Sequence, residues 1–140
     1  MKPVHLSTCV WDTWHVDLLT RILWPCILAE KNLPAFVHKC SAIYRICTTR
    51  RDQERMRQMP VLKAISKLVA IEFIDTPTED PEPIFHMHWF SQGVKEAREQ
   101  GAIFFNLWPD VIFTDRTLAS AADAIADGRA GCVIPTLGGE

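Results

Sequence analysis

The sequence predicts an α/β fold, with a mostly parallel sheet of about five strands and helices on both faces. Two observations lead to this prediction. Short segments rich in apolar and β-branched residues alternate along the chain with segments of helical periodicity, and the short segments are apolar almost throughout, as in sheets buried on both faces. The 140 residues suffice for one domain, which we expect to span residues 1–140.

The first strand and the first helix lie near the N-terminus. Residues 4–10 combine apolar and β-branched side chains and predict a strand. From Val16 onwards, leucine and isoleucine recur every three to four residues, which predicts a helix with one buried face. We expect Pro25 to kink or divide this helix, because proline lacks a backbone N–H. Residues 32–34, which end in proline, are expected to end the segment.

Two further strands frame a second helical segment. Residues 41–48 and residues 69–74 are rich in β-formers and predict the second and third strands. Between them, either Thr49 or Asp52 is expected to cap a helix, because short polar side chains accept hydrogen bonds from the first free N–H groups of a helix. Pro60 is expected to begin another helical turn.

The second half of the chain begins with a loop. Residues 76–83 contain three prolines and three acids and predict exposed, irregular structure. The second half of residues 84–99 has helical spacing, and Gly101 is expected to end that helix. Residues 102–107 then predict a fourth strand, which Pro109 forces to stop because it cannot donate to the sheet.

The last regular elements follow a second short apolar run. Asp115 or Thr117 is expected to cap a helix that Gly128 terminates. Residues 129–134 predict a fifth strand, and the remaining residues predict a tail.

Composition excludes several classes of function. The net charge is −2, and the basic stretch at residues 45–57 is interrupted by Asp52 and Glu54, so we expect neither nucleic acid nor a membrane surface as a partner. No apolar run reaches the ~20 residues of a membrane span, and no signal peptide is recognised. The five cysteines include no Cys-x-x-Cys pair, which favours reduced thiols in a cytoplasmic protein.

Polar and aromatic residues follow four of the predicted strands. Because parallel strands share their carboxyl ends, these residues are expected to meet at one edge of the sheet, where α/β proteins bind ligands. An aromatic ring can stack on a base, a hydroxyl or carboxylate can bind its polar edge, and a cation can neutralise phosphates. Taken singly, each residue also fits an ordinary loop position. The candidates are Trp11, Asp12, Thr48, Arg50, Asp52 and Asp110.

Other nucleotide and metal motifs are absent from the sequence. No glycine-rich dinucleotide fingerprint follows the first strand, and there is no P-loop motif. His86 and His88 suggest zinc, but residues two apart do not share a helix face and no further pair completes four ligands. His88 fits a phosphate or sugar contact, or a helix cap.

Residues 103–128 resemble the strand, acidic motif and helix of GT-A-type nucleotide-sugar glycosyltransferases. The resemblance implies a Rossmann-like fold of the nucleotide-diphospho-sugar transferase type and a domain that binds a nucleoside-diphosphate sugar. Asp110 matches the last acid of the family's Asp-x-Asp motif, which implies binding of Mg²⁺ or Mn²⁺. The first acid falls on Trp108, so half of the signature is missing.

The same resemblance places the nucleotide base beside Trp11 and Asp12, with Asp52 near the base edge. Family members usually continue into an acceptor-binding half, whereas this sequence stops at Glu140. The chain is therefore expected to be a fragment or a stand-alone donor-binding half, and no catalytic residue is assigned.

Two alternatives compete with a glycosyltransferase. The first is a non-catalytic, degenerate domain that binds a partner or forms a homodimer, favoured by the lost acid and by an apolar patch built from Trp11, Trp14, Trp24 and Trp89. The second is a flavodoxin-like or receiver-like domain. A receiver domain requires an acidic pair after the first strand and a lysine near the fifth, and the fifth segment has no lysine.

Overall fold

A four-stranded, wholly parallel sheet forms the centre of the protein in the computed structural model, which describes residues 2–129. The strands lie in the order β3-β2-β1-β4. This arrangement confirms the predicted α/β class and the parallel sheet. The predicted fifth strand lies outside the described residues from residue 130 onwards. The strands are β1 (Val4–Cys9), β2 (Ala42–Thr48), β3 (Ala70–Asp75) and β4 (Ile103–Asn106).

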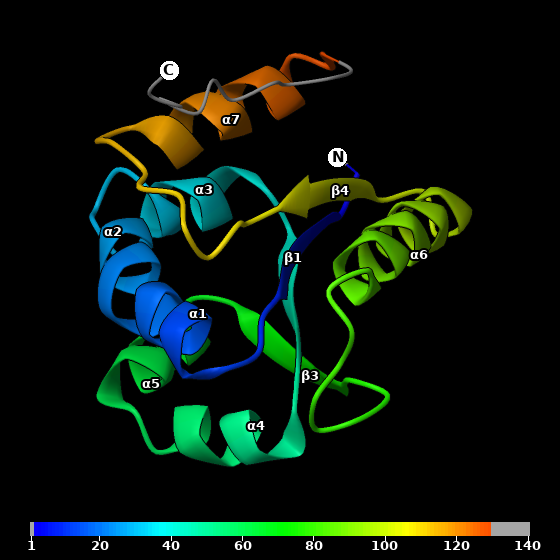
Figure 1. Ribbon diagram of the computed structural model, residues 1–140. Coiled ribbons are helices and arrows are strands. Elements are labelled where there is room, and N and C mark those ends of the chain that lie inside the picture. The colour runs from blue at the N-terminus through cyan, green and yellow to red at the C-terminus, as the bar shows by residue number, and fades with distance from the viewer. Residues whose placement is uncertain (1, 130–140) are drawn as a thin grey trace, which may run out of the picture.

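Helices cover both faces of this sheet (Figure 1). Helix α6 packs on β1 and β4 from one face, and the helices that join β1 to β2 and β2 to β3 lie on the other. No helix among the described residues is long and apolar enough to cross a membrane. The helices are α1 (Thr13–Leu18), the π-helix η1 (Leu19–Leu23), α2 (Trp24–Ile27), α3 (Leu33–Lys39), α4 (Arg50–Arg57), α5 (Pro60–Ser66), α6 (Phe85–Glu99) and α7 (Thr117–Ala126).

The first helical segment accommodates Pro25 by forming a π-helical turn directly before it. The backbone N–H of Trp24 donates to the carbonyl of Leu19, an i→i−5 bond of the π type. In a continuous α-helix the carbonyl of Arg21 would accept from the N–H of residue 25, which proline lacks. The π turn directly before Pro25 changes the bonding pattern, so that this bond is not required. Proline therefore divides the segment into α1, η1 and α2 without ending it.

A chain of buried hydrogen bonds joins β1, β2, α2 and the residue that follows β4 in the core. The indole Nε1 of Trp24 donates to the Tyr44 hydroxyl at 3.0 Å, and that hydroxyl lies 2.7 Å from Oγ1 of Thr8. Because Thr8 donates its own proton to the carbonyl of Leu107 at 2.8 Å, Tyr44 is the donor to Thr8. Burial raises the pKa of Tyr44 to about 12, which keeps this proton in place. The chain fixes where the polypeptide leaves β4.

Helix α7 begins at a cap that the sequence does not predict. The side-chain Oδ1 of Asn32 accepts from the backbone N–H of Leu118 at 3.0 Å. The predicted caps Asp115 and Thr117 are wrong, since Arg116 with φ of 70° occupies the N-cap position and makes no side-chain cap bond. Asn32 is buried and also donates to the carbonyls of Cys26 and Thr114.

Helix α3 is another departure from the predicted order. Residues 32–34 do not merely end a segment, because α3 begins at Leu33 with Pro34 in its first turn. A proline there lacks only a donor that the first turn leaves free anyway.

Helix α6 is likewise longer than predicted, because it is helical from Phe85 and not only in its second half. Of the predicted caps for α4, Thr49 is the one that occupies the N-cap.

The four cysteines within the described residues carry free thiols, as predicted. Cys9 and Cys47 are partners in the β1–β2 ladder and both are buried. The hydrogen bond to Cys47, followed by burial, raises the pKa of the Cys9 thiol well above its ordinary value. These thiols pack beneath Trp89 of α6 and serve as core residues.

Candidate functional site

The carboxyl ends of the strands share one edge of the sheet, and the chain changes direction there. It leaves β1 for α1 on one face, whereas it enters β4 from α6 on the other face (Figure 1). In open α/β sheets, the loops beside such a reversal separate and leave room for a ligand. The loops after β1 and β4 and the start of α6 therefore define the candidate site.

Trp11 provides the aromatic surface of this site. Its ring stacks on His86 with centroids 4.3 Å apart and an interplanar angle of 23°. It also meets the ring of Phe85 in a tilted arrangement at 6.1 Å. Trp11 is half-buried, so α6 fixes the indole while leaving part of it open to a ligand.

Asp12 and His15 form a pair beside this aromatic surface. Asp12 is the N-cap of α1 and adopts φ of 70°. Its Oδ1 accepts from the His15 backbone N–H at 2.9 Å, and its Oδ2 lies 2.8 Å from His15 Nδ1. Burial opposes the charge on Asp12, but the backbone and ring hydrogen bonds from His15 outweigh it and lower the pKa of the carboxyl. The pair is exposed and faces solvent.

His86 shows that the two loops converge. Burial is the largest cause lowering the pKa of His86, and the charge of His15 adds to it. The carboxylates of Asp12 and Asp110 act on the same imidazole in the opposite direction. A residue from each of the β1 and β4 loops thus lies within electrostatic reach of a single ring at the start of α6.

Asp110 follows β4 and is itself exposed, although its neighbour Pro109 is buried. The nearby Trp108 stacks on Phe90 of α6 with ring centroids 6.5 Å apart. No third carboxylate, histidine or thiol joins Asp110 to form a metal-ligating group within residues 2–129. Mg²⁺ commonly takes one or two protein carboxylates and completes its shell with phosphates and water, so Asp110 fits a cation that arrives with a phosphorylated ligand.

The other three candidates belong to a second group at the ends of β2 and β3. Thr48 is fully buried, and its hydroxyl has no hydrogen-bond partner among the described residues. Asp52 is buried and accepts from the Thr49 hydroxyl at 2.9 Å, within the cap of α4. Arg50 is exposed and donates from Nε to Asp75 at 3.0 Å. Asp52 and Arg50 are therefore engaged by the cap of α4 and by Asp75. Thr48 lies at the end of β2 beside the β1 loop, since the Val10 N–H donates to the carbonyl of Cys47 at 3.0 Å.

Asp75 is the centre of that second group. Hydrogen bonds from Gln53 and then from Arg50 lower the pKa of its carboxyl. Gln53 Nε2 lies 2.7 Å from Asp75 Oδ1. The Arg50 guanidinium is therefore already paired with a carboxylate.

Two other expectations from the sequence concern the patch of four tryptophans and the histidines His86 and His88. Trp24 and Trp89 are buried, at 0% and 5% exposure, so the predicted patch of four tryptophans is wrong. The histidines His86 and His88 both lie on α6, where His88 is exposed and His86 stacks on Trp11.

Sequence reasoning missed the roles of His15 and His86. For His15 a signal exists, because Asp12 and His15 have the spacing of an N-cap and the third residue of the helix. The stack of His86 on Trp11 joins distant parts of the chain and has no local signature.

Comparison with protein-family models, with curated proteins and with solved structures finds no match for this chain.

Proposed function

We propose that the loops after β1 and β4 bind the nucleotide of a nucleoside-diphosphate sugar, and that the domain acts in a glycosyltransferase-like protein. The stack of Trp11 on His86, beside Asp12 and Asp110 at the reversal of the sheet, is the observation that carries this proposal. A nucleobase extends such a stack, and base–aromatic stacking contributes about 1–3 kcal/mol.

The charges around the stack favour a ligand that brings a cation. Asp12 and Asp110 both lie within electrostatic reach of His86, and two carboxylates repel a bare diphosphate. A divalent cation, Mg²⁺ or Mn²⁺, offsets that repulsion and stabilises charge on a leaving diphosphate. Asp110 is the residue we assign to it, because its carboxylate is exposed at the end of β4.

Asp12 has a different role in this proposal. Both of its carboxylate oxygens are engaged by His15, so it holds the β1 loop and the His15 ring in place. This fixed pair leaves Nε2 of His15 free to donate to or accept from a ribose or sugar hydroxyl.

The experiment is a thermal-shift panel of UDP, GDP and their sugars, each with and without Mn²⁺. Specific binding raises the melting temperature by an amount that grows with the logarithm of the ligand concentration divided by its Kd. We expect stabilisation by at least one nucleoside diphosphate in the presence of Mn²⁺ and a smaller shift without it. Inorganic diphosphate with Mn²⁺ is the control for binding without a base, and equal shifts with it would remove the nucleotide from the proposal.

A second candidate function is a non-catalytic domain that associates through this edge. Large apolar side chains stay exposed on the same loops and first helical turns, and exposed apolar clusters mark interaction surfaces. Size-exclusion chromatography with light scattering distinguishes the two, because self-association without nucleotide-dependent stabilisation supports the second alone. The exposed residues are Trp14, Ile84, Met87, Trp108 and Ile112, between 42% and 69% exposed.

A further inference from the structure

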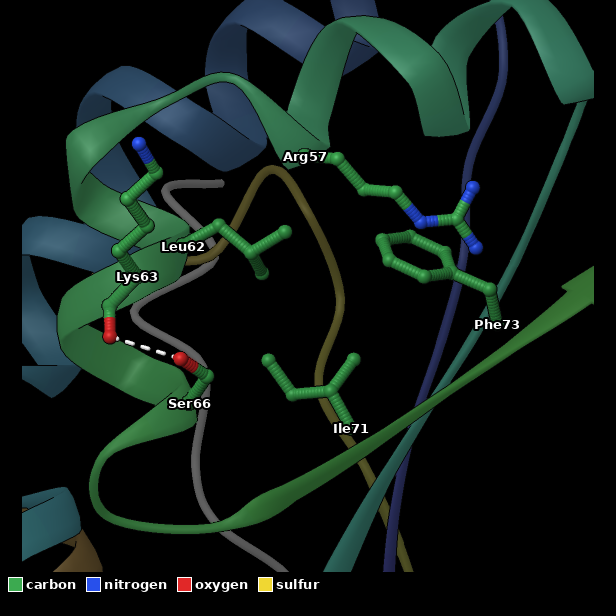
Figure 2. A pocket seen from close by; sticks show the side chains of 6 residues that line it. All are labelled: Arg57, Leu62, Lys63, Ser66, Ile71 and Phe73. Carbon is green, nitrogen blue, oxygen red and sulfur yellow. Dashed lines mark hydrogen bonds between the residues drawn. The ribbon is translucent and has the colours of Figure 1, made fainter.

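A hollow on the opposite side of the β2–β3 unit from α6 is separate from the nucleotide site. It has a volume of about 330 Å³ and lies between β3 and the α4–α5 pair. Figure 2 shows Leu62 of α5 and Ile71 of β3 pointing into it, with Arg57 laid across the ring of Phe73. The guanidinium carbon of Arg57 is 4.6 Å from the ring centroid. The hollow therefore has an apolar floor and a cationic side.

Strand β3 is an edge strand beside this hollow. It pairs with β2 along one side, and no other strand within residues 2–129 pairs with its outer side. An open edge offers backbone N–H and C=O groups to any extended chain that approaches. The hollow and the open edge are thus parts of one surface.

The two faces of β3 differ in chemistry. Ile71 and Phe73 face the hollow with α4 and α5, and both are half-buried. Glu72 lies on the other face, where Arg45 donates to it at 3.0 Å. Its neighbour on that face, Ile74, is half-buried. An added strand would meet the hollow, with Arg57 at its side, on one face and a mixed, partly apolar surface on the other.

The cations beside the hollow are available to a partner. Arg57 and Lys63 form no ion pair with any carboxylate in the described part of the chain. The nearby Asp75 is paired with Arg50, and the further contact of Arg57 is a long hydrogen bond of 3.4 Å to Gln53. Charge complementarity therefore favours an acidic occupant.

We propose that the outer edge of β3 binds an extended segment of a partner protein in which acidic residues alternate with apolar ones. The segment adds to the sheet as a fifth, outer strand, with backbone hydrogen bonds to β3. Its acidic side chains reach Arg57, which lies over Phe73 at the side of the hollow, and its apolar side chains lie on the face of Ile74. This inference is independent of the nucleotide site.

A second copy of this chain fits the edge less well. Symmetric antiparallel pairing of β3 with itself has its greatest overlap when centred on Glu72 or on Phe73. If the two-fold axis passes at Glu72, the Glu72 carboxylates of the two copies lie directly opposite each other. If it passes at Phe73, the two Phe73 rings meet, and with them the Arg57 side chain that lies over each ring. Like charges opposite each other destabilise strand pairing.

The test uses a capped peptide of about eight residues that alternates valine and glutamate. Titration is followed by backbone amide NMR on the full chain, where we expect shifts concentrated in β3, α4 and α5. The variant Arg57→Gln should weaken binding about tenfold, because one charge-assisted contact is lost. The control Lys95→Gln removes an exposed lysine of α6 and should leave binding unchanged.

Two further peptides give outcomes that decide the proposal. The same peptide with alternate backbone nitrogens methylated cannot pair with β3 and should not bind, and a valine–lysine peptide should not bind either. Equal binding of the methylated peptide, or no shifts with the valine–glutamate peptide, would overturn the proposal. Concentration-dependent shifts of β3 amides without peptide would assign the edge to a second copy instead. Circular dichroism of each variant confirms that it is folded.

Discussion

The hydroxyl of Tyr44 donates to Oγ1 of Thr8 across 2.7 Å in the middle of the core. The bond matters for the proposed nucleotide site because Thr8 in turn donates to the carbonyl of Leu107, directly after β4. The segment that carries Asp110 therefore starts from a position that β1 and β2 determine together. Since every member of the chain has a partner, the chain specifies one arrangement of these strands.

Replacing Tyr44 with phenylalanine should lower the free energy of unfolding by about 1–3 kcal/mol, because the Trp24 indole N–H loses its buried acceptor. Urea denaturation measures this loss. Thr8→Val and the double variant complete a cycle in which the two losses should not add, since the residues share one bond. Additive losses would show that the hydroxyls act separately.

Asn32→Ala should destabilise the protein by about 1–2 kcal/mol, the usual effect of removing a helix cap. The matched control is Asp115→Ala, which removes the cap that the sequence suggests. Asp115 is exposed and pairs on the surface with Lys31, so its loss should stay within about 0.5 kcal/mol. A larger loss for Asp115→Ala than for Asn32→Ala would contradict the assignment of the α7 cap.

Gly93→Ala should destabilise the protein even though alanine favours a helix by about 1 kcal/mol over glycine. A Cβ at Gly93 would lie 2.6 Å from Cε2 of Phe104, so α6 would have to move away from β4. Overpacking of this kind costs about 1–3 kcal/mol. Thermal denaturation of this variant and of the exposed control Ser91→Ala measures the effect, and an equal or raised melting temperature for Gly93→Ala would refute the close contact.

His86 should titrate below its ordinary pKa of 6.5, because burial disfavours the imidazolium. The unfolded chain then binds the proton more readily than the folded one. The contribution of His86 to stability is therefore complete above pH 6.5 and is lost as the pH falls through the lower folded-state pKa. NMR titration of the ring gives this pKa directly, and Trp11→Ala should raise it by exposing the ring.

The pH dependence of stability has a second source. Burial, followed by the charge of Arg45, also lowers the pKa of His5, so both histidines act in the same direction. His86→Gln should accordingly reduce, but not abolish, the loss of stability below pH 6.5. An unchanged slope would show that His86 is as accessible to protons in the folded protein as in the unfolded chain.

Local patterns in the sequence predict the strands well. The apolar runs that become β1 to β4 are recognised because each is short, rich in β-formers and bounded by turn residues. The parallel sheet correctly implies that residues after the strands lie at one edge. The cap that Asn32 supplies to α7 is not predictable in this way, because it depends on how α3 and α7 pack.

The candidate site is predicted in part for the same reason. Trp11, Asp12 and Asp110 follow β1 and β4, which are neighbours in the sheet. Trp11 stacks on His86, and Asp12 and Asp110 lie within electrostatic reach of the same ring. Arg50 and Asp52 also follow a strand, but the cap of α4 and the ion pair with Asp75 engage them. Strand ends reveal which residues reach the edge, whereas their partners there depend on tertiary contacts.

The most direct test of the proposed nucleotide site is calorimetric titration of the wild type with the nucleotide sugar that stabilises it most, in the presence of Mn²⁺. We expect Trp11→Ala to weaken binding by about 10- to 100-fold through lost stacking. Asp110→Ala should bind more weakly and no longer respond to Mn²⁺, whereas Asp115→Ala should bind as the wild type does. Wild-type affinity in both Trp11→Ala and Asp110→Ala would contradict the site.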